Sequence, residues 1–369
     1  MDKVELLFEN VNSKNHSVGG CYIDNKLKIK EQHFSIKSVY KIIEHIKWIS
    51  QNVKSANIKI LINSESIVDQ VVILIFESVI YYTLKVLQIN IRYRFELDKN
   101  TIGYMFYKNS LLYKYNNCKI EKAKYIRDYE KNCIIYKNHY RKRCIPSEDK
   151  KILSITMDEV ASFFKNLYVE EEYSDDLSEV IIEIIGNAVE HSGSSCICNI
   201  NVLSCVKEKI IDIAIVDYSK IYFGTGIENY LKSEEKYLYN ERNKIVLDAY
   251  SIHKEFFSDK YNSNDFFMLS AFQKNVSSRK DSPNSGGTGL TTLIKALIDK
   301  SIANFCYACS GETVLLFKKD FLELTQDGLI GFNEKNDYIN EIPSSKIIAR
   351  NLYNINVNAY NLQFIFKES

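Results

Sequence analysis

The stretch DDLSEVIIEIIGNAVEHS, from Asp175 to Ser192, decides how the second half of the chain is organised. At about 100° per residue its apolar side chains fall on one stripe, which predicts an amphipathic helix. This stripe consists of Leu177, Ile181, Ile184, Ile185 and Ala188. Glu183, Asn187 and Glu190 fall on the opposite side, and the first two lie one turn apart. An acid and an amide at this spacing can orient a water molecule and hold Mg²⁺, although a polar helix face is more often only solvated.

Three further stretches follow in order. The apolar run IIDIAIVDYS ends in Asp217, and Gly224 and Gly226 come soon after it. The segment AFQKNVSSRK contains Ser278 and Arg279. The segment SGGTGLTTLIKALI is a glycine cluster that continues directly into a helical pattern. Each stretch alone is unspecific, and their order along one chain is what carries information.

In type, order and spacing these motifs resemble the ATP-binding domain of the GHKL family, which includes gyrase B, a class of heat-shock chaperones, histidine kinases and MutL. The family's ExxxN motif matches Glu183 to Asn187, and its aspartate-glycine motif matches Asp217 with the two later glycines. Its lid signature appears as NVSSR. Its GGxGL motif matches Gly286, Gly287, Thr288, Gly289 and Leu290. The resemblance covers roughly residues 151 to 320.

The resemblance implies ATP and Mg²⁺ as ligands of a Bergerat-type α/β sandwich. It implies that Asn187 ligates the metal and that Glu183 acts as general base on water. Asp217 would accept the exocyclic amino proton of adenine, although an aspartate also commonly starts a turn. The chain departs from the family here, because Ser219 and Ile221 stand where the first glycines are expected. We interpret Gly224 and Gly226 as the displaced pair, which would let the backbone approach base and sugar.

The glycine cluster of residues 286–289 would cradle the phosphates, because backbone N–H groups and the helix dipole at a helix start favour anions. No GxxxxGK[ST] loop is present, so the pattern is not a Walker A site. Arg279 or Lys280 of the lid would reach the γ-phosphate. His191, two turns after Glu183, would act at the phosphates or simply pack or cap.

Length and composition set broad bounds. A chain of 369 residues predicts two domains. The net charge of +1 points to neither nucleic acid nor a membrane surface. The start of the chain has no secretory pattern, so we expect a cytoplasmic protein whose 9 cysteines are free thiols. Zinc is not expected, because Cys306 and Cys309 would point to opposite faces of an extended segment.

Residues 1–145 predict a smaller α/β domain of the βαβ type. The expected strands are 4–8, 26–30, 57–63 and 89–95, and the expected helices are 35–51 and 64–87. The apolar window Val71 to Leu84 predicts a buried helix. At fold level the region is faintly similar to STAS-type regulatory domains, and it shows no phosphate loop or nucleophile motif. We therefore expect a sensing, docking or dimerisation unit.

The charged segment 136–151 marks the expected boundary, and its cluster Arg141 to Arg143 would be a solvated junction or, alternatively, a contact for a phosphate backbone. The ATP-binding domain would span 146–320 with a lid insertion at 228–284, and 321–369 would extend it. Its expected strands are 151–156, 196–205, 210–217 and the hairpin 303–319, with 361–367 in the extension. Its expected helices are 158–168, 175–192 and 290–299.

The sequence thus predicts an α+β protein that binds ATP with Mg²⁺ and hydrolyses it as a conformational switch in intracellular signalling or defence. A protein partner or a second copy of the chain would receive the signal. Two alternatives stay open: a protein kinase of the anti-sigma or histidine-kinase type, and a scaffold that senses the nucleotide without hydrolysis. None of the six histidines sits in the phosphoacceptor pattern of a histidine kinase.

Overall fold

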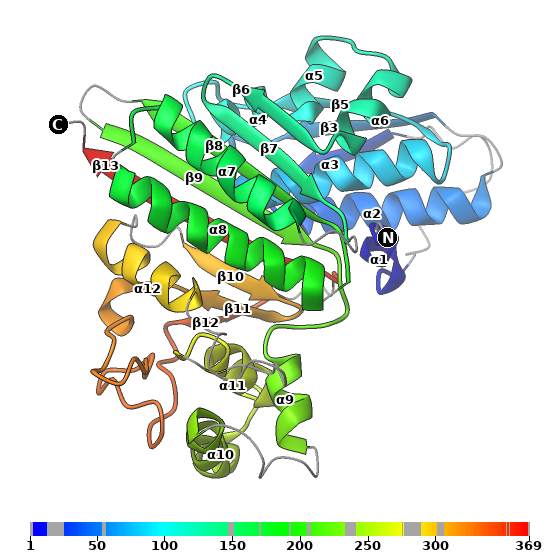
Figure 1. Ribbon diagram of the computed structural model, residues 1–369. Helices are drawn as coiled ribbons and strands as arrows, with labels where there is room; N and C mark the ends of the chain where they lie inside the picture. Colours follow the sequence, from blue (N-terminus) through cyan, green and yellow to red (C-terminus); the bar gives the residue numbers. More distant parts are fainter. Residues whose placement is uncertain are drawn as a thin grey trace.

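The structure is a computed structural model of an α+β protein. It describes residues 3–12, 26–53, 57–146, 151–169, 171–191, 193–204, 208–232, 241–274, 276, 289–300, 306–351, 353 and 355–367. The strands of the described residues form one sheet of three strands, one of eight strands and one short two-stranded sheet, and helices cover them (Figure 1).

The N-terminal unit is built on a small parallel sheet of order β1-β3-β5. Its strands are β1 (Lys26–Lys30), β3 (Asn57–Asn63) and β5 (Asn90–Glu96), and a short pair is formed by β2 (His33–Phe34) and β4 (Ser66–Ile67). Its helices are α1 (Leu6–Glu9), α2 (Ile36–Asn52), α3 (Gln70–Lys85), α4 (Ile102–Asn109), α5 (Leu111–Asn117) and α6 (Lys122–Glu130). The parallel pairing of β1, β3 and β5 confirms the predicted βαβ pattern.

The large sheet is antiparallel throughout, in the order β12-β11-β10-β13-β9-β8-β7-β6. Its strands are β6 (Cys133–Tyr136), β7 (His139–Cys144), β8 (Cys196–Ser204), β9 (Glu208–Asp217), β10 (Tyr307–Ser310), β11 (Thr313–Leu316), β12 (Ile348–Arg350) and β13 (Asn358–Lys367). The remaining elements are α7 (Lys151–Asn166), α8 (Glu171–His191), α9 (Thr225–Lys232), α10 (Glu241–His253), η2 (Lys254–Phe256), α11 (Ser263–Ser270), α12 (Gly289–Lys300) and η3 (Lys319–Phe321).

Both faces of the large sheet are covered (Figure 1). Helices α7, α8 and α12 lie side by side on one face and enclose what we call the α8 core, and helix α3 covers the other face and encloses the α3 core. Strand β9 serves both cores, because alternate side chains point to opposite faces. Ile213 and Ile215 belong to the α8 core, whereas Ala214 and Val216 belong to the α3 core. This explains why β9 is apolar almost throughout.

Helix α3 is buried on all sides, as its apolar window predicts. It begins later than the predicted residue 64, because Asp69 caps it by accepting a hydrogen bond of 2.9 Å from the N–H of Val72. It lies between its own parallel sheet and the strands β9 and β13. The N-terminal unit and the large sheet therefore share one hydrophobic core.

Two predicted strands are wrong. Residues 4–8 form a turn and α1, and the side chains of Val4, Leu7, Phe8 and Val11 are buried at helical spacing. Residues 151–156 form the first part of α7, where Thr156, Val160 and Phe163 are buried at a similar spacing. Both predictions used windows of five or six residues, which are too short to separate the two periods.

Neither expectation for Arg141 to Arg143 is correct, because all three side chains are buried in β7. Arg141 donates to Glu77 of α3 at 2.9 Å, with both side chains 2% exposed. Lys142 points to the other face and pairs with Glu159 of α7 at 2.8 Å. Strand alternation thus sends successive charges to partners on opposite faces.

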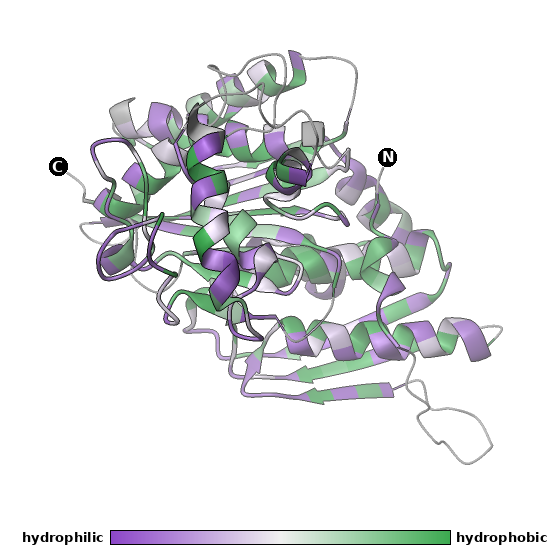
Figure 2. Ribbon diagram, turned by 90° about the horizontal axis from the view of Figure 1, so that it is seen from below, coloured by the Kyte–Doolittle hydropathy of each residue, from purple (hydrophilic) through white to green (hydrophobic). Residues whose placement is uncertain are grey.

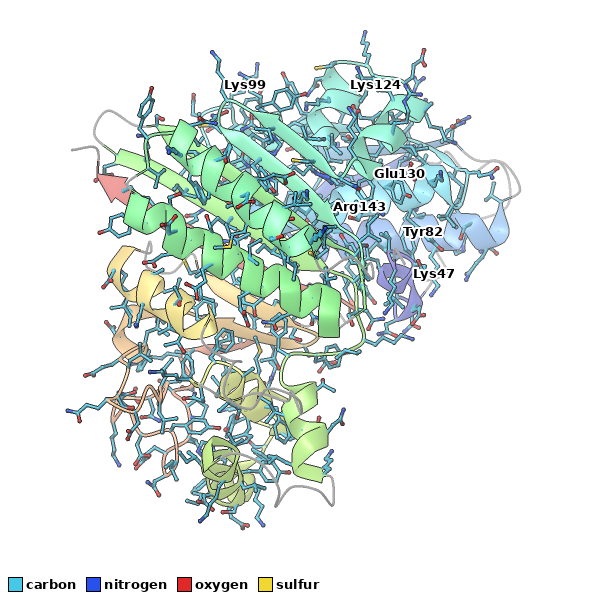
Figure 3. All side chains as sticks on the ribbon, in the orientation of Figure 1. Lys47, Tyr82, Lys99, Lys124, Glu130 and Arg143 are labelled. Carbon is cyan, nitrogen blue, oxygen red and sulfur yellow. The ribbon has the colours of Figure 1, made fainter. Side chains whose placement is uncertain are left out.

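Side chains of α2 and α3 hold α1 in place (Figure 3). Lys47 donates to the carbonyl oxygens of Phe8 and Val11 at 2.8 and 2.7 Å, and the ring of Tyr82 lies 4.6 Å from that of Phe8. Hydrophobic and hydrophilic residues alternate along the outer helices (Figure 2), as expected for helices that cover a core with one face.

The predicted domain boundary at residues 145–146 stays a prediction, although β6 and β7 already pair with the large sheet before it. The predicted tail strand is confirmed and begins three residues earlier, at Asn358, in the middle of the sheet between β10 and β9. In the described part of the insertion 228–284 the elements are helical, as the lack of a β pattern indicates. No helix of the described residues is long and apolar enough to cross a membrane.

Candidate functional site

Helix α8 supplies the acid and the amide. Its apolar stripe is buried against the sheet as predicted, with Ile181 and Ile185 fully enclosed. Glu183 and Asn187 lie half-buried beside that stripe. The Asn187 Nδ2 donates to the Glu183 Oε1 at 3.5 Å, which is a long hydrogen bond. The amide of Asn187 is thereby turned so that its oxygen points away from the carboxylate.

Asp217 closes β9 and is buried, with 4% of its surface exposed. Side chains two residues apart share a face of a strand. Asp217 therefore lies on the same face as Ile213 and Ile215, beneath α8. Its direct neighbours across the sheet are Cys196 on β8 and Asn358 on β13.

Tyr360 lies on the sheet face that carries Asp217. This tyrosine is buried in the α8 core, two residues after Asn358 on the same face of β13. Burial raises the pKa of its phenol, and the negative charges of Asp217 and Glu183 raise it further. The negative charges of Asp217 and Glu183 thus both act on one buried phenol, although the two residues are far from each other in the sequence.

The segment after Asp217 is held by a network that the sequence did not reveal. Asn358 donates from Nδ2 to Asp217 Oδ1 at 3.2 Å and to the carbonyl of Ile221 at 2.9 Å. Ser310 of β10 donates to Asn358 Oδ1 at 2.6 Å and accepts from the N–H of Phe223 at 2.9 Å. The predicted tail strand 361–367 begins three residues after Asn358, and its pattern does not identify the partner strands, so the sequence gives no signal for this residue.

A glycine is required at position 224 because another segment of the protein, helix α11, lies close to its backbone. Its φ of +82° is in the left-handed region, and a Cβ there would lie 2.2 Å from the carbonyl oxygen of Phe267 on α11. Gly226 is exposed in the first turn of α9. Helix α11 is itself fixed to the sheet edge, where Arg350 of β12 contacts both carboxylate oxygens of Asp265 at 2.5 Å. Contacts of the two glycines with a nucleotide stay a prediction.

Helix α12 begins at Gly289 as the glycine cluster predicts, and Leu290 is its second residue. It packs beside α8 through Leu293, Ile294 and Leu297. Only six residues join its end to the start of β10. Its first turn therefore lies toward the end of the sheet where β10 finishes, which is also where β9 finishes with Asp217.

Several predicted site residues cannot be placed. Ser278, Arg279, Lys280, Gly286, Gly287 and Thr288 lie outside the described residues. His191 ends α8, but its side chain is outside the described part, as is that of Glu190. Their roles stay predictions.

The donor set of the site suits a hard cation. Asn187 offers an amide oxygen, the ligand type that Mg²⁺ prefers, and its Nδ2 is already directed to Glu183. Among the described residues no group of three or more His, Cys, Asp and Glu side chains is placed to hold a metal. The described cysteines are free thiols, and Cys306 and Cys309 face opposite cores as predicted.

No protein-family model, no curated protein and no solved structure matches this chain. The site itself combines a buried carboxylate acceptor at a strand end with an acid and an amide one helical turn apart. Such a set can accept a hydrogen bond from an amino group and, beside it, polarise a water molecule.

Proposed function

We propose that this chain binds ATP with Mg²⁺ and hydrolyses it as a conformational switch. The observation that carries the proposal is that Glu183 and Asn187 near the end of α8 and Asp217 at the end of β9 lie over the same face and toward the same end of the large sheet, because β8 begins soon after α8 with Cys196 opposite Asp217. The sequence motifs predict that these residues bind the metal, the attacking water and adenine. One bound nucleotide can contact all three only if they lie no farther apart than its own length. Three helices over one face of an antiparallel sheet are the layering that a Bergerat-type sandwich requires.

Each residue has a defined role. Asp217 would accept a hydrogen bond from the exocyclic amino group of adenine, and Asn187 would hold Mg²⁺ through its amide oxygen. Mg²⁺ held there would neutralise charge on the phosphates. Glu183 takes a proton from the attacking water, and the Asn187 amide holds its carboxylate by the 3.5 Å contact. A base placed in this way contributes about 10²–10⁴-fold to the rate.

The first turn of α12 supports phosphate binding in the same proposal. It is directed to the end of the sheet where Asp217 lies, and backbone N–H groups at a helix start favour anions. The glycines that precede Gly289 would extend this cradle.

The switch part of the proposal rests on contacts between the segment after β9 and the N-terminal unit. Asp217 and Tyr218 are consecutive, so they face opposite sides of the sheet. The Tyr218 hydroxyl donates to Ser78 of α3, and Lys220 pairs with Glu9 of α1 at 2.5 Å. A nucleotide that moved this segment would therefore act directly on α1 and α3 of the N-terminal unit, and this unit is the candidate for docking a partner or a second copy.

The proposal is tested first by binding. Titration calorimetry with ATP and Mg²⁺ is expected to show a complex for the wild-type protein and none for Asp217→Asn. A normal affinity in that variant would contradict the role of Asp217. Asp248→Asn, an exposed aspartate on α10, is the matched control.

Turnover is tested separately. We expect Glu183→Ala to keep ATP binding and to lose at least about a hundredfold in phosphate release. Incubation with ATP labelled at the γ-phosphate separates the alternatives: free phosphate indicates an ATPase, labelled protein a kinase, and unchanged ATP a sensor or scaffold. Normal hydrolysis by Glu183→Ala would show that this glutamate is not the base.

A further inference from the structure

Asn358 stands at the point where three strands meet the predicted base site. It is the first residue of β13, is 3% exposed, and lies directly opposite Asp217 on β9 and Ser310 on β10. Its amide makes three hydrogen bonds, two from Nδ2 and one to Oδ1. No motif of the sequence assigns it a role.

The direction of these hydrogen bonds is fixed by the two backbone groups at which the series of hydrogen bonds begins and ends. The N–H of Phe223 can only donate, so the Ser310 hydroxyl accepts from it at 2.9 Å and directs its own proton to Asn358 Oδ1 at 2.6 Å. The carbonyl of Ile221 can only accept, so it faces Asn358 Nδ2 at 2.9 Å. Both ends require the same orientation of the amide.

That orientation acts on Asp217. Asn358 presents an N–H to Asp217 Oδ1 at 3.2 Å, so Asp217 is the acceptor of this hydrogen bond. The amide thereby holds the carboxyl group of Asp217 in an orientation in which it accepts. An adenine amino group can donate to it, whereas the carbonyl of a 6-oxopurine would oppose it with a second acceptor.

We propose that Asn358 is the positioning residue of Asp217 and makes the site select a 6-aminopurine nucleotide over a 6-oxopurine nucleotide. The inference rests on the proposed nucleotide binding. The same amide ties Ile221 to the sheet, so it also fixes the start of the loop that would border the base.

The test measures the affinities of ATP and of inosine triphosphate, a 6-oxopurine nucleotide, by titration calorimetry with Mg²⁺. Opposed acceptors in a buried site cost affinity, so we expect the wild-type protein to prefer ATP by about ten- to a hundredfold. In Asn358→Asp two carboxyl groups would share the site and one would keep a proton, which gives the pair a donor. We expect the ratio of the two affinities to fall by about tenfold or more in this variant.

The ratio of the ATP and inosine triphosphate affinities distinguishes a positioning role from simple structural damage, because structural damage would weaken the binding of both nucleotides equally. Asn361→Asp is the matched control, because Asn361 lies on the same strand, is equally buried and faces the α3 core. Its ratio should equal that of the wild type. Ser310→Ala, which removes the hydroxyl that orients Asn358, provides the same readout should Asn358→Asp not fold, and it is also expected to lower the ratio.

Each outcome has a definite meaning. A lower ratio in Asn358→Asp or Ser310→Ala with an unchanged control supports the inference. Equal weakening of both nucleotides, or a wild-type protein that binds both equally, overturns the inference and leaves ATP binding in place. A wild-type protein that binds neither nucleotide overturns the proposed function and this inference with it.

Discussion

Replacing Asp212 by Asn should make the protein more stable at neutral and alkaline pH. Asp212 lies on the face of β9 that meets α3, and it is fully buried. Its Oδ2 accepts from Nε2 of Gln363, and its backbone carbonyl accepts from Nε2 of Gln70 at 3.3 Å. The groups that face it are polar or acidic, including Asp69, and no cation among the described residues pairs with it.

The magnitude follows from the pKa. Burial raises the pKa of Asp212 from the ordinary 3.8 to about 8, and the hydrogen bond from Gln363 offsets only part of this effect. The folded state therefore binds the proton more tightly than the unfolded state. Stability falls as the pH rises from about 4 to about 8 and then stays level. At about 1.4 kcal/mol per pH unit, the wild type should lose roughly 4 kcal/mol between pH 5 and pH 8 through this group.

The assay is urea denaturation at a series of pH values from about 5 to about 8. Asn keeps the oxygen that accepts from Gln363 and carries no charge, so Asp212→Asn should show a slope flatter by about that amount. Asp248→Asn, with its side chain exposed on α10, should keep the wild-type slope. Parallel curves for the wild type and Asp212→Asn would refute the reasoning, because Asp212 would then be ionised or hydrated in the folded protein.

Two further changes test the packing around the site. Arg141→Met should destabilise the protein by about 3–5 kcal/mol in denaturation, because it leaves the buried carboxylate of α3 without its partner. Lys232→Met, at an exposed pair, should have a much smaller effect, and equal effects of the two changes would contradict the burial of the first pair. Gly224→Ala should cost at least about 1–3 kcal/mol of stability and weaken ATP binding, because its Cβ would meet the carbonyl of Phe267. Gly193→Ala, at a residue with a similar φ of +56° and open space around it, should show only the cost of backbone strain. A thermal melt that ranks the two variants in the opposite order would be evidence against the close approach.

The sequence predicted those parts of the fold that local periodicity determines. The helix around Ile181 and Ile185 and the apolar strand that ends in Asp217 are long enough for their patterns to be unambiguous. The pattern could also place Glu183 beside Asn187, since that contact is local. It failed for residues 4–8 and 151–156, where short windows fit a strand and a helix equally well.

What the sequence could not predict depends on pairing across long distances. Asn358 meets Asp217 across 141 residues of sequence, and only the strand order brings them together. The basic run at Arg141 suggested a solvated junction, because its partner Glu77 lies on a helix 64 residues earlier. A charged side chain can be buried only when a partner compensates its charge, and the composition of a segment does not identify that partner.

The central place of β13 also bears on how the protein is made. Strands β9 and β10 are each hydrogen-bonded to β13, so the two halves of the large sheet have no common neighbour until residues 358–367 have left the ribosome. A nascent chain of about 350 residues would expose two apolar strand edges, which are templates for aggregation. The risk of aggregation during translation is therefore greatest just before this last central strand arrives.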